Sequence, residues 1–288
     1  EWLPSAPLHV LLYRYLGWED VMPKFAHLPL ILKPDGNGKL SKRDGDRLGF
    51  PVFPLEWKDP ISNEISSGYR EKGYFNDAFV NMLAFLGWNP GSSQEIFSLD
   101  ELIEAFSLER VGKSGAKFDP DKTKWFNQQY LRSKSNSELA KLLTSTHEIN
   151  ADNSFIEGVV GLMKERASFV NELLADDYFF NAPLEYDQKT LRKKWKSSTS
   201  ANMDLLKTKL SSLATFNAES IEEGFKDFLT ENELGMGAAL PNFRLLVTGK
   251  GMGPSMFQIA ALLGKKEVLS RFKDGLLKIS AIKEETSI

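Results

Sequence analysis

Two lysines three positions apart, Lys39 and Lys42, lie in a short basic segment directly after a glycine-containing turn. The segment reads Lys-Leu-Ser-Lys-Arg over residues 39–43. Lysine ammonium groups bind phosphoryl oxygens as point charges, and a flexible loop can close on a polyphosphate as charge develops during phosphoryl or adenylyl transfer. Taken alone, the pentapeptide is a weak signal that a basic surface loop explains better.

A second stretch, residues 110–124, has the composition of a surface that contacts RNA locally. It holds five basic residues, and the aromatic side chains of Phe118 and Trp125 lie within it or directly after it. Basic and aromatic residues together suit phosphate contact beside base stacking. The alternative is that Trp125 and Tyr130 belong to a core while the basic residues are solvated.

A third stretch, residues 250–257, reads Lys-Gly-Met-Gly-Pro-Ser-Met-Phe and predicts a loop followed by a helix that starts at Pro254. It is a candidate RNA contact, but the preference of proline for the first helical position explains Pro254 equally well. Another basic run, residues 189–196, is better explained as a solvated amphipathic helix.

Composition limits the class of protein. With 288 residues, of which 42% are hydrophobic and 11% aromatic, the chain can build one large domain or two to three ordinary ones. A net charge of −3 argues against a global positive field, so any RNA contact must be local. The chain has no cysteine and only three scattered histidines, so we expect no metal site. No apolar run approaches the ~20 residues of a membrane span and no signal peptide is recognisable, so we expect a cytoplasmic protein without a membrane partner.

The elements that must position these residues change character along the chain. Residues 28–32 form a short apolar run that predicts a buried strand, and residues 33–38 have turn chemistry. The basic pentapeptide therefore follows a strand and a turn. Residues 48–67 lack a helical period and predict an irregular excursion, to which we assign no function.

Helical periodicity follows. Residues 75–86 place apolar side chains on one face, and Gly87 is a candidate stop. Ser98 and Glu101 have the spacing of a capping box. From about residue 135 the pattern is helical with short breaks, which predicts an all-α module.

Many segments of the chain resemble those of bacterial glutamyl-tRNA synthetases, which are class I aminoacyl-tRNA synthetases, and they occur in the same order. The resemblance covers nearly the whole chain. Its motifs are residues 1–9, 25–32, the KMSKS-type signature at 39–43, and residues 68–74, 85–88, 111–119, 124–131, 245–249 and 263–265.

The resemblance implies an ATP site. Lys42 matches the lysine that contacts the ATP phosphates, and Lys39 is its companion in the loop, so both are expected to be catalytic. Trp2 matches a residue that lines the adenosine and amino-acid pocket. The further residues expected to bind the nucleotide are Leu30 and Ile31, which present backbone to the adenine, and Ser41 in the loop. Mg²⁺ is expected with ATP in the intact enzyme.

The resemblance also implies tRNA contacts. The expected residues are Lys113, Lys117, Lys124, Trp125, Pro254 and Met256. Lys124 lies at or next to the position where discriminating members carry an arginine that inspects the third anticodon base. Because lysine lacks the planar fork of arginine, discrimination between tRNA(Glu) and tRNA(Gln) stays open.

The fold that follows is mainly α. We expect a short α/β remnant of a Rossmann catalytic domain at residues 1–34, a KMSKS loop and stem-contact region at 35–90, and two all-α anticodon-binding subdomains at 91–148 and 149–288. The chain contains no His-Ile-Gly-His sequence, the family signature that stabilises the adenylate transition state. We therefore expect the isolated chain to be catalytically inactive.

The leading hypothesis is part of a monomeric glutamate-tRNA ligase whose partners are ATP, glutamate and tRNA(Glu). Two alternatives stay open. One is a free-standing helical RNA-binding module without ligase activity, and the other is an enzyme that charges both tRNA(Glu) and tRNA(Gln).

Overall fold

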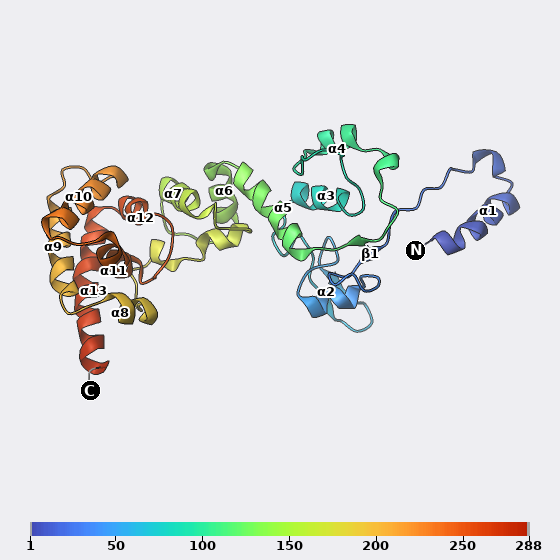
Figure 1. Cartoon of the computed structure of the whole chain (residues 1–288). Coiled ribbons are helices and arrows are strands. Elements are labelled where there is room, and N and C mark those ends of the chain that lie inside the picture. Colours follow the sequence, from blue (N-terminus) through green and yellow to red (C-terminus); the bar gives the residue numbers. More distant parts are fainter. Residues whose placement is uncertain (1, 287–288) are drawn as a thin grey trace. The chain divides into compact units, whose positions relative to one another are not determined.

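A computed structural model describes the backbone of residues 2–286. The side chains of residues 42, 43, 46 and 283–286 lie outside the described part. The chain divides into two compact units, Glu1–Ser133 and Lys134–Ile288 (unit 1 and unit 2), which are described separately below (Figure 1).

Unit 1 combines short helices with four two-residue strands. In chain order its 3-10 helices (η), α-helices and strands are η1 (Leu3–Ser5), α1 (Ala6–Tyr15), η2 (Glu19–Val21), β1 (Ile31–Leu32), α2 (Lys42–Leu48), β2 (Trp57–Lys58), β3 (Ile65–Ser66), α3 (Asn76–Ala84), α4 (Leu99–Ala105), η3 (Leu108–Arg110), β4 (Ala116–Lys117) and α5 (Pro120–Ser133). β2 and β3 pair antiparallel within the excursion at residues 48–67.

Strand β1 connects the basic loop to a distant part of unit 1. It pairs in parallel with β4, and the N–H of Ala116 donates to the carbonyl of Leu30 at 2.8 Å. After a turn the chain returns, and the N–H of Leu40 donates to the carbonyl of Ile31 at 2.9 Å. Residues 39–40 and 116–117, which are distant in sequence, are therefore held against one strand.

Helices α3 and α5 pack together at the core of unit 1 around Met82, Phe118 and Phe126. Two buried asparagines fix loops to these helices. The Oδ1 atom of Asn81 accepts from the N–H of Phe97 at 2.9 Å, and that of Asn127 accepts from the N–H of Phe75 at 2.8 Å. Because a buried backbone donor without a partner is costly, these amides specify how the loops cross the helices.

In its described residues, unit 2 has helices as its only regular secondary structure. Its elements are α6 (Asn136–Thr146), α7 (Asn153–Met163), η4 (Val170–Leu174), η5 (Asp177–Phe179), α8 (Gln188–Lys194), α9 (Thr199–Ser212), α10 (Ala218–Glu231), α11 (Met236–Thr248), α12 (Met256–Leu263) and α13 (Lys265–Thr286). The aromatic core is contributed by α10, α11 and α13, where Phe225 stacks on Phe243 at 5.8 Å between ring centroids and Phe243 meets Phe272 at 5.4 Å.

The mainly helical fold is confirmed, and so is the capping box at Ser98. The Ser98 hydroxyl accepts from the N–H of Glu101, whose carboxylate accepts from the N–H of Ser98, so the capping box is present. Helix α3 ends at Ala84, and Gly87, in the turn that follows, has a φ of +96°, a conformation that favours glycine.

Two local predictions were wrong. Helix α12 starts at Met256 and not at Pro254, because Ser255 is its N-cap and Pro254 belongs to the preceding loop. The apolar run at 28–32 is not a buried strand: only Ile31 and Leu32 are in strand geometry, and the side chain of Leu28 is 67% exposed. The segments that pack against residues 28–32 bury only part of this apolar run.

The most heavily bonded buried charge in unit 2 is Arg271, a residue of α13 that is 3% exposed. Its Nη1 atom donates to the carbonyls of Tyr178 at 2.6 Å and Val247 at 2.9 Å, and its Nε donates to Glu267 at 2.7 Å. The guanidinium thereby joins α13 to η5 and to the end of α11.

Replacing Arg271 with alanine should lower the free energy of unfolding by roughly 3–5 kcal/mol, because two buried carbonyls lose their donor and a cavity forms. Urea unfolding followed by circular dichroism measures the change. Lys273→Ala, an exposed substitution on the same helix, should change it by less than about 0.5 kcal/mol. Equal effects of the two substitutions would contradict the assigned role of Arg271.

Candidate functional site

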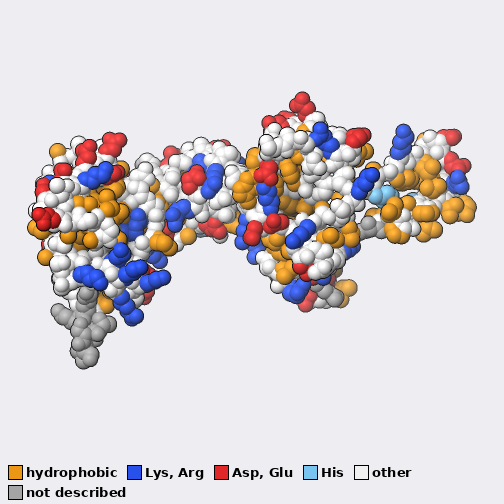
Figure 2. All heavy atoms as spheres, in the orientation of Figure 1, with side chains coloured by type: hydrophobic (Ala, Val, Ile, Leu, Met, Phe, Trp, Pro, Cys, Tyr) orange, Lys and Arg blue, Asp and Glu red, His pale blue; other side chains and the backbone are white. Residues whose placement is uncertain are grey.

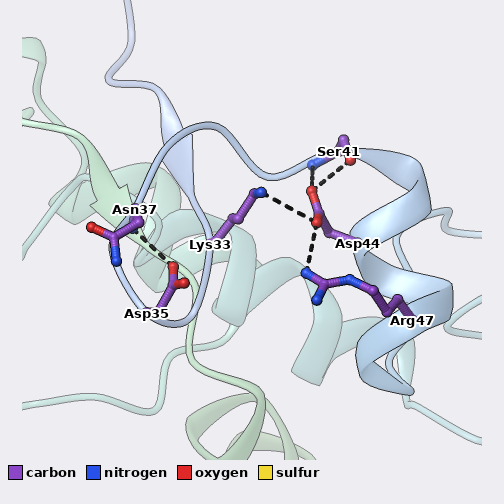
Figure 3. Close-up of polar contacts among 6 residues, drawn as sticks. All are labelled: Lys33, Asp35, Asn37, Ser41, Asp44 and Arg47. Atoms are coloured by element: carbon purple, nitrogen blue, oxygen red, sulfur yellow. Dashed lines mark hydrogen bonds and ion pairs between the residues drawn. The ribbon is translucent and has the colours of Figure 1, made fainter.

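The basic loop is organised around a buried carboxylate, that of Asp44 in the first turn of α2. Its Oδ2 accepts from the backbone N–H of Ser41 at 3.1 Å and from the Ser41 hydroxyl at 2.5 Å. Its Oδ1 lies 3.4 Å from Nζ of Lys33 and 3.1 Å from Nη2 of Arg47. Figure 3 shows these three side chains converging on Asp44. The carboxylate therefore joins the strand end to the helix that carries the signature.

These contacts hold the pKa of Asp44 well below its usual range. The largest cause is the hydrogen bond from the Ser41 hydroxyl, while burial opposes it and the Ser41 N–H, Arg47 and Lys33 contribute further lowering. Asp44 is thus ionised at neutral pH, and it pairs with two of the cations around the loop.

The predicted loop residues lie on either side of this carboxylate. Lys39 is exposed, and its backbone pairs with Leu32 on the return from the turn. Ser41 is the N-cap of α2, with its hydroxyl proton given to Asp44. Lys42 is the first residue of α2, and its side chain lies outside the described part.

A cavity of about 600 Å³ in unit 1 gathers four of the residues expected to bind ATP. Trp2, Leu30, Ile31 and Lys39 all line it. Ser41 is not among its lining residues, which also include His9. Side chains from the start of the chain, from strand β1 and from the basic loop thus face one space, large enough for a small ligand.

Two backbone carbonyls of residues that line this cavity have unused hydrogen-bonding capacity. The carbonyls of Leu30 and Ile31 each accept one hydrogen bond, from Ala116 and Leu40 respectively. A carbonyl oxygen can accept two. The ring of Trp2 is 67% exposed and lies 5.7 Å from that of His9, so an aromatic surface is available beside the strand.

The basic segment before α5 is exposed on the other side of β1. Lys113 lines a second cavity of about 510 Å³, together with Leu28 to Leu30. Lys117 is in β4 and Lys124 in the first turns of α5, and all three lysines are exposed. Pairing of β4 with β1 brings Lys117 opposite Leu32.

Trp125 is half-buried and packs against the core around Phe126. The Nζ atom of Lys122 lies 3.6 Å from the centre of its ring and 2.6 Å from Oε1 of Glu95. A cation thus already contacts the indole of Trp125. The interpretation of Trp125 as a core residue applies to only part of its surface.

The segment at residues 250–257 presents different atoms from those that the sequence suggested. Met256 is only 2% exposed and packs in the core of unit 2, whereas Met252 is 82% exposed. Pro254 is half-buried, and its carbonyl accepts from Nη2 of Arg244 at 2.7 Å. Arg244 is itself largely buried, and burial lowers its pKa. The arginine therefore holds the backbone of the loop at Pro254 against helix α11.

Neither a metal centre nor a membrane span is found in the described part of the chain. No group of three His, Asp or Glu side chains there could hold a metal ion. None of the described helices is both long and apolar enough to cross a bilayer.

Comparison with known proteins finds a family match for each of the two units. A family model of an anticodon binding domain matches residues 130–276, just over half of the chain. A model of the catalytic domain of class I tRNA synthetases (E and Q) matches residues 1–125. A glutamate–tRNA ligase of Bacteroides fragilis is 55% identical over 277 residues, which are 95% of this chain. The chain belongs to the glutamate–tRNA ligase family.

Other members of the family agree. The ligase of Flavobacterium johnsoniae is 53% identical over 280 residues. The crystal structure of a glutamate tRNA ligase from Elizabethkingia meningosepticum, in complex with its amino acid, aligns with a TM-score of 0.89 at 44% identity, over 96% of this chain and 56% of that one. The chain spans about 55% of the length of the curated relatives that it matches.

Sequence reasoning missed three residues that organise these sites. Asp44 follows two basic residues, and its spacing from Ser41 is that of a capping box, a signal that could have identified it. Arg244 lies in a largely apolar helix, where a charge is unusual. Met252 carried no distinguishing signal, because exposure of one methionine in a glycine-rich loop depends on tertiary packing.

Replacing Ser41 with alanine should raise the pKa of Asp44 toward the usual ~3.9, because the largest stabilising contact of the carboxylate is lost. Carboxyl carbon shifts followed by NMR across an acid titration measure this pKa. The depressed pKa of the folded wild-type protein stabilises it above about pH 4, and this contribution is lost as the pH falls toward the folded-state pKa. An Asp44 pKa near 3.9 in the wild-type chain would contradict the network.

Proposed function

We propose that this chain is the part of a glutamate–tRNA ligase that supplies the phosphate-binding loop, one side of the adenosine pocket and the surface that binds the anticodon arm. In the intact enzyme, glutamate attacks the α-phosphate of ATP, pyrophosphate leaves, and glutamyl adenylate forms. The glutamyl group is then transferred from the adenylate to a hydroxyl at the acceptor end of tRNA(Glu), and AMP leaves. Mg²⁺ would accompany ATP, bound by phosphate oxygens and water. We also propose a cytoplasmic monomer.

The observation that carries the nucleotide half of this proposal is the shared cavity. Trp2, Leu30 and Lys39 are separated in sequence, yet they line the same 600 Å³ space. Their chemistry is complementary to one ligand, since an exposed indole suits adenine, unused carbonyl capacity suits its amino group, and an ammonium group suits phosphate.

The buried carboxylate of Asp44 gives the loop a defined resting form. By accepting from Ser41 it holds the start of α2, and by pairing with Lys33 and Arg47 it keeps two cations occupied. We infer that Lys39 and Lys42 are the loop cations that act on the phosphates. Binding through the Ser41 hydroxyl as a donor would require that hydroxyl to leave Asp44.

The RNA half of the proposal rests on family membership and on the placement of exposed groups. Lys113, Lys117 and Lys124 are exposed, and Lys117 and Lys124 belong to consecutive elements, β4 and α5. In unit 2 the exposed residues of the 250–257 segment are Lys250, Met252 and Ser255. We propose that these groups contact the anticodon stem and loop, with Pro254 and Met256 fixing the shape of that surface.

Replacing Lys39 with alanine should weaken ATP binding by about tenfold, which corresponds to the loss of one charge-assisted contact of about 1.4 kcal/mol. Equilibrium dialysis of the full chain with labelled ATP measures the dissociation constant. Lys58→Ala is the matched control, because Lys58 is an exposed lysine of β2 outside the cavity.

The outcomes of that titration separate the alternatives. A loss specific to Lys39→Ala supports the nucleotide site. Equal affinities for ATP in the wild-type, Lys39→Ala and Lys58→Ala chains would overturn the assignment of Lys39, and a wild-type chain without ATP affinity would favour a helical RNA-binding module.

A further inference from the structure

Unit 2 contains a hollow of about 490 Å³ whose walls carry four lysines, Lys189, Lys193, Lys194 and Lys250. Three of them come from α8, and Lys250 comes from the loop that follows α11. Figure 2 shows basic side chains gathered where Figure 1 draws α8. The sequence alone favoured a solvated amphipathic helix here, but a second chain segment closes the space beside it.

Close backbone packing builds this hollow. The N–H of Asp187 donates to the carbonyl of Gly249 at 2.8 Å, which fixes the start of α8 against the end of α11. A Cβ atom on Gly251 would lie 2.2 Å from Oγ1 of Thr190, so only glycine lets the loop come this close to the helix. The lysines from the two segments are therefore held near one another by the fold.

The charge of the hollow is largely uncompensated. In the part of the chain that the structure describes, the ammonium groups of Lys189, Lys193 and Lys250 form no hydrogen bond or short ion pair, and that of Lys194 donates to the carbonyl of Gly237 at 3.2 Å. Asp187 is the one carboxylate among the lining residues, all of which are described. Its Oδ1 accepts from the N–H of Thr190 at 2.7 Å. The pKa of Asp187 is lowered, first by a hydrogen bond from the Thr190 side chain and then by the Thr190 N–H, and the charges of Lys189 and Lys250 lower it further.

Gathering lysines at this density costs repulsion that an anion would relieve. The exposed side chain of Met252 also lines the hollow and offers an apolar surface beside the positive charge. A phosphodiester backbone with an attached ribose or base matches both features, whereas an isolated phosphate would use only the charge.

We propose that this lysine-lined hollow binds backbone phosphates of the RNA strand that the 250–257 segment contacts. The inference rests on the proposed function, because it extends anticodon-arm binding from that segment to α8. It assigns Lys193 and Lys250 as phosphate contacts that hold the strand irrespective of base sequence.

The test uses the full chain and two fluorescent RNA probes: the anticodon stem-loop of tRNA(Glu), and the same stem-loop with all three anticodon bases replaced. Anisotropy titrations from about 50 to 200 mM salt give the affinity and its salt dependence. The test variant is Lys193→Ala/Lys250→Ala. The control is Lys266→Ala/Lys273→Ala, which removes two exposed lysines of α13 outside the hollow.

The test variant should bind both probes on the order of tenfold more weakly, and the slope of log affinity against log salt should flatten by about 1.4, the value for two single-strand phosphates. The control should keep affinity and slope. If the wild-type chain prefers the native anticodon while the test variant matches it in affinity and slope, the hollow inference falls and the proposed function stands. A wild-type chain that binds neither probe would overturn both.

Discussion

The arrangement of unit 1 depends on the pairing of one short strand, β1, with two other segments. The carbonyl of Leu30, directly before β1, accepts from the N–H of Ala116. The carbonyl of Ile31 accepts from the N–H of Leu40, where the chain returns from the turn. These bonds decide where Lys39 lies relative to the cavity and where Lys117 lies relative to the loop. A strand of two residues has little stability of its own, so the register also depends on the core beneath it, where Phe118 packs against Phe126 and Met82.

Charge is arranged differently in the two units. Around the signature loop a buried carboxylate, Asp44, pairs with Lys33 and Arg47, so two cations of the resting loop already have an acidic partner. In the hollow beside α8 the lysines have almost no such counterpart. The first arrangement suits a loop that must rearrange around a substrate, and the second suits a surface that stays ready for a polyanion. Both are local, which agrees with a net charge of −3 for the whole chain.

Sequence reasoning succeeded where short-range physics decides the structure. The capping box of Ser98 and Glu101 and the stop at Gly87 depend on neighbours within a few residues. It could not find the pairing of Ile31 with Ala116, because nothing local records a contact across 85 positions. The exposure of Leu28, the burial of Met256 and the three hydrogen bonds of Arg271 likewise depend on which helices pack together. The ligand-binding residues carried by the family resemblance stay predictions.

The central claim is that unit 1 presents a nucleotide cavity and that each unit presents exposed groups that bind the anticodon arm. Hydrogen–deuterium exchange of the full chain, measured by mass spectrometry with ATP and with tRNA(Glu) in separate samples, tests it most directly. We predict that ATP slows exchange at residues 25–40 and that tRNA(Glu) slows it at residues 113–125, 189–194 and 250–256. Exchange in these segments that is unchanged by either ligand would contradict the account.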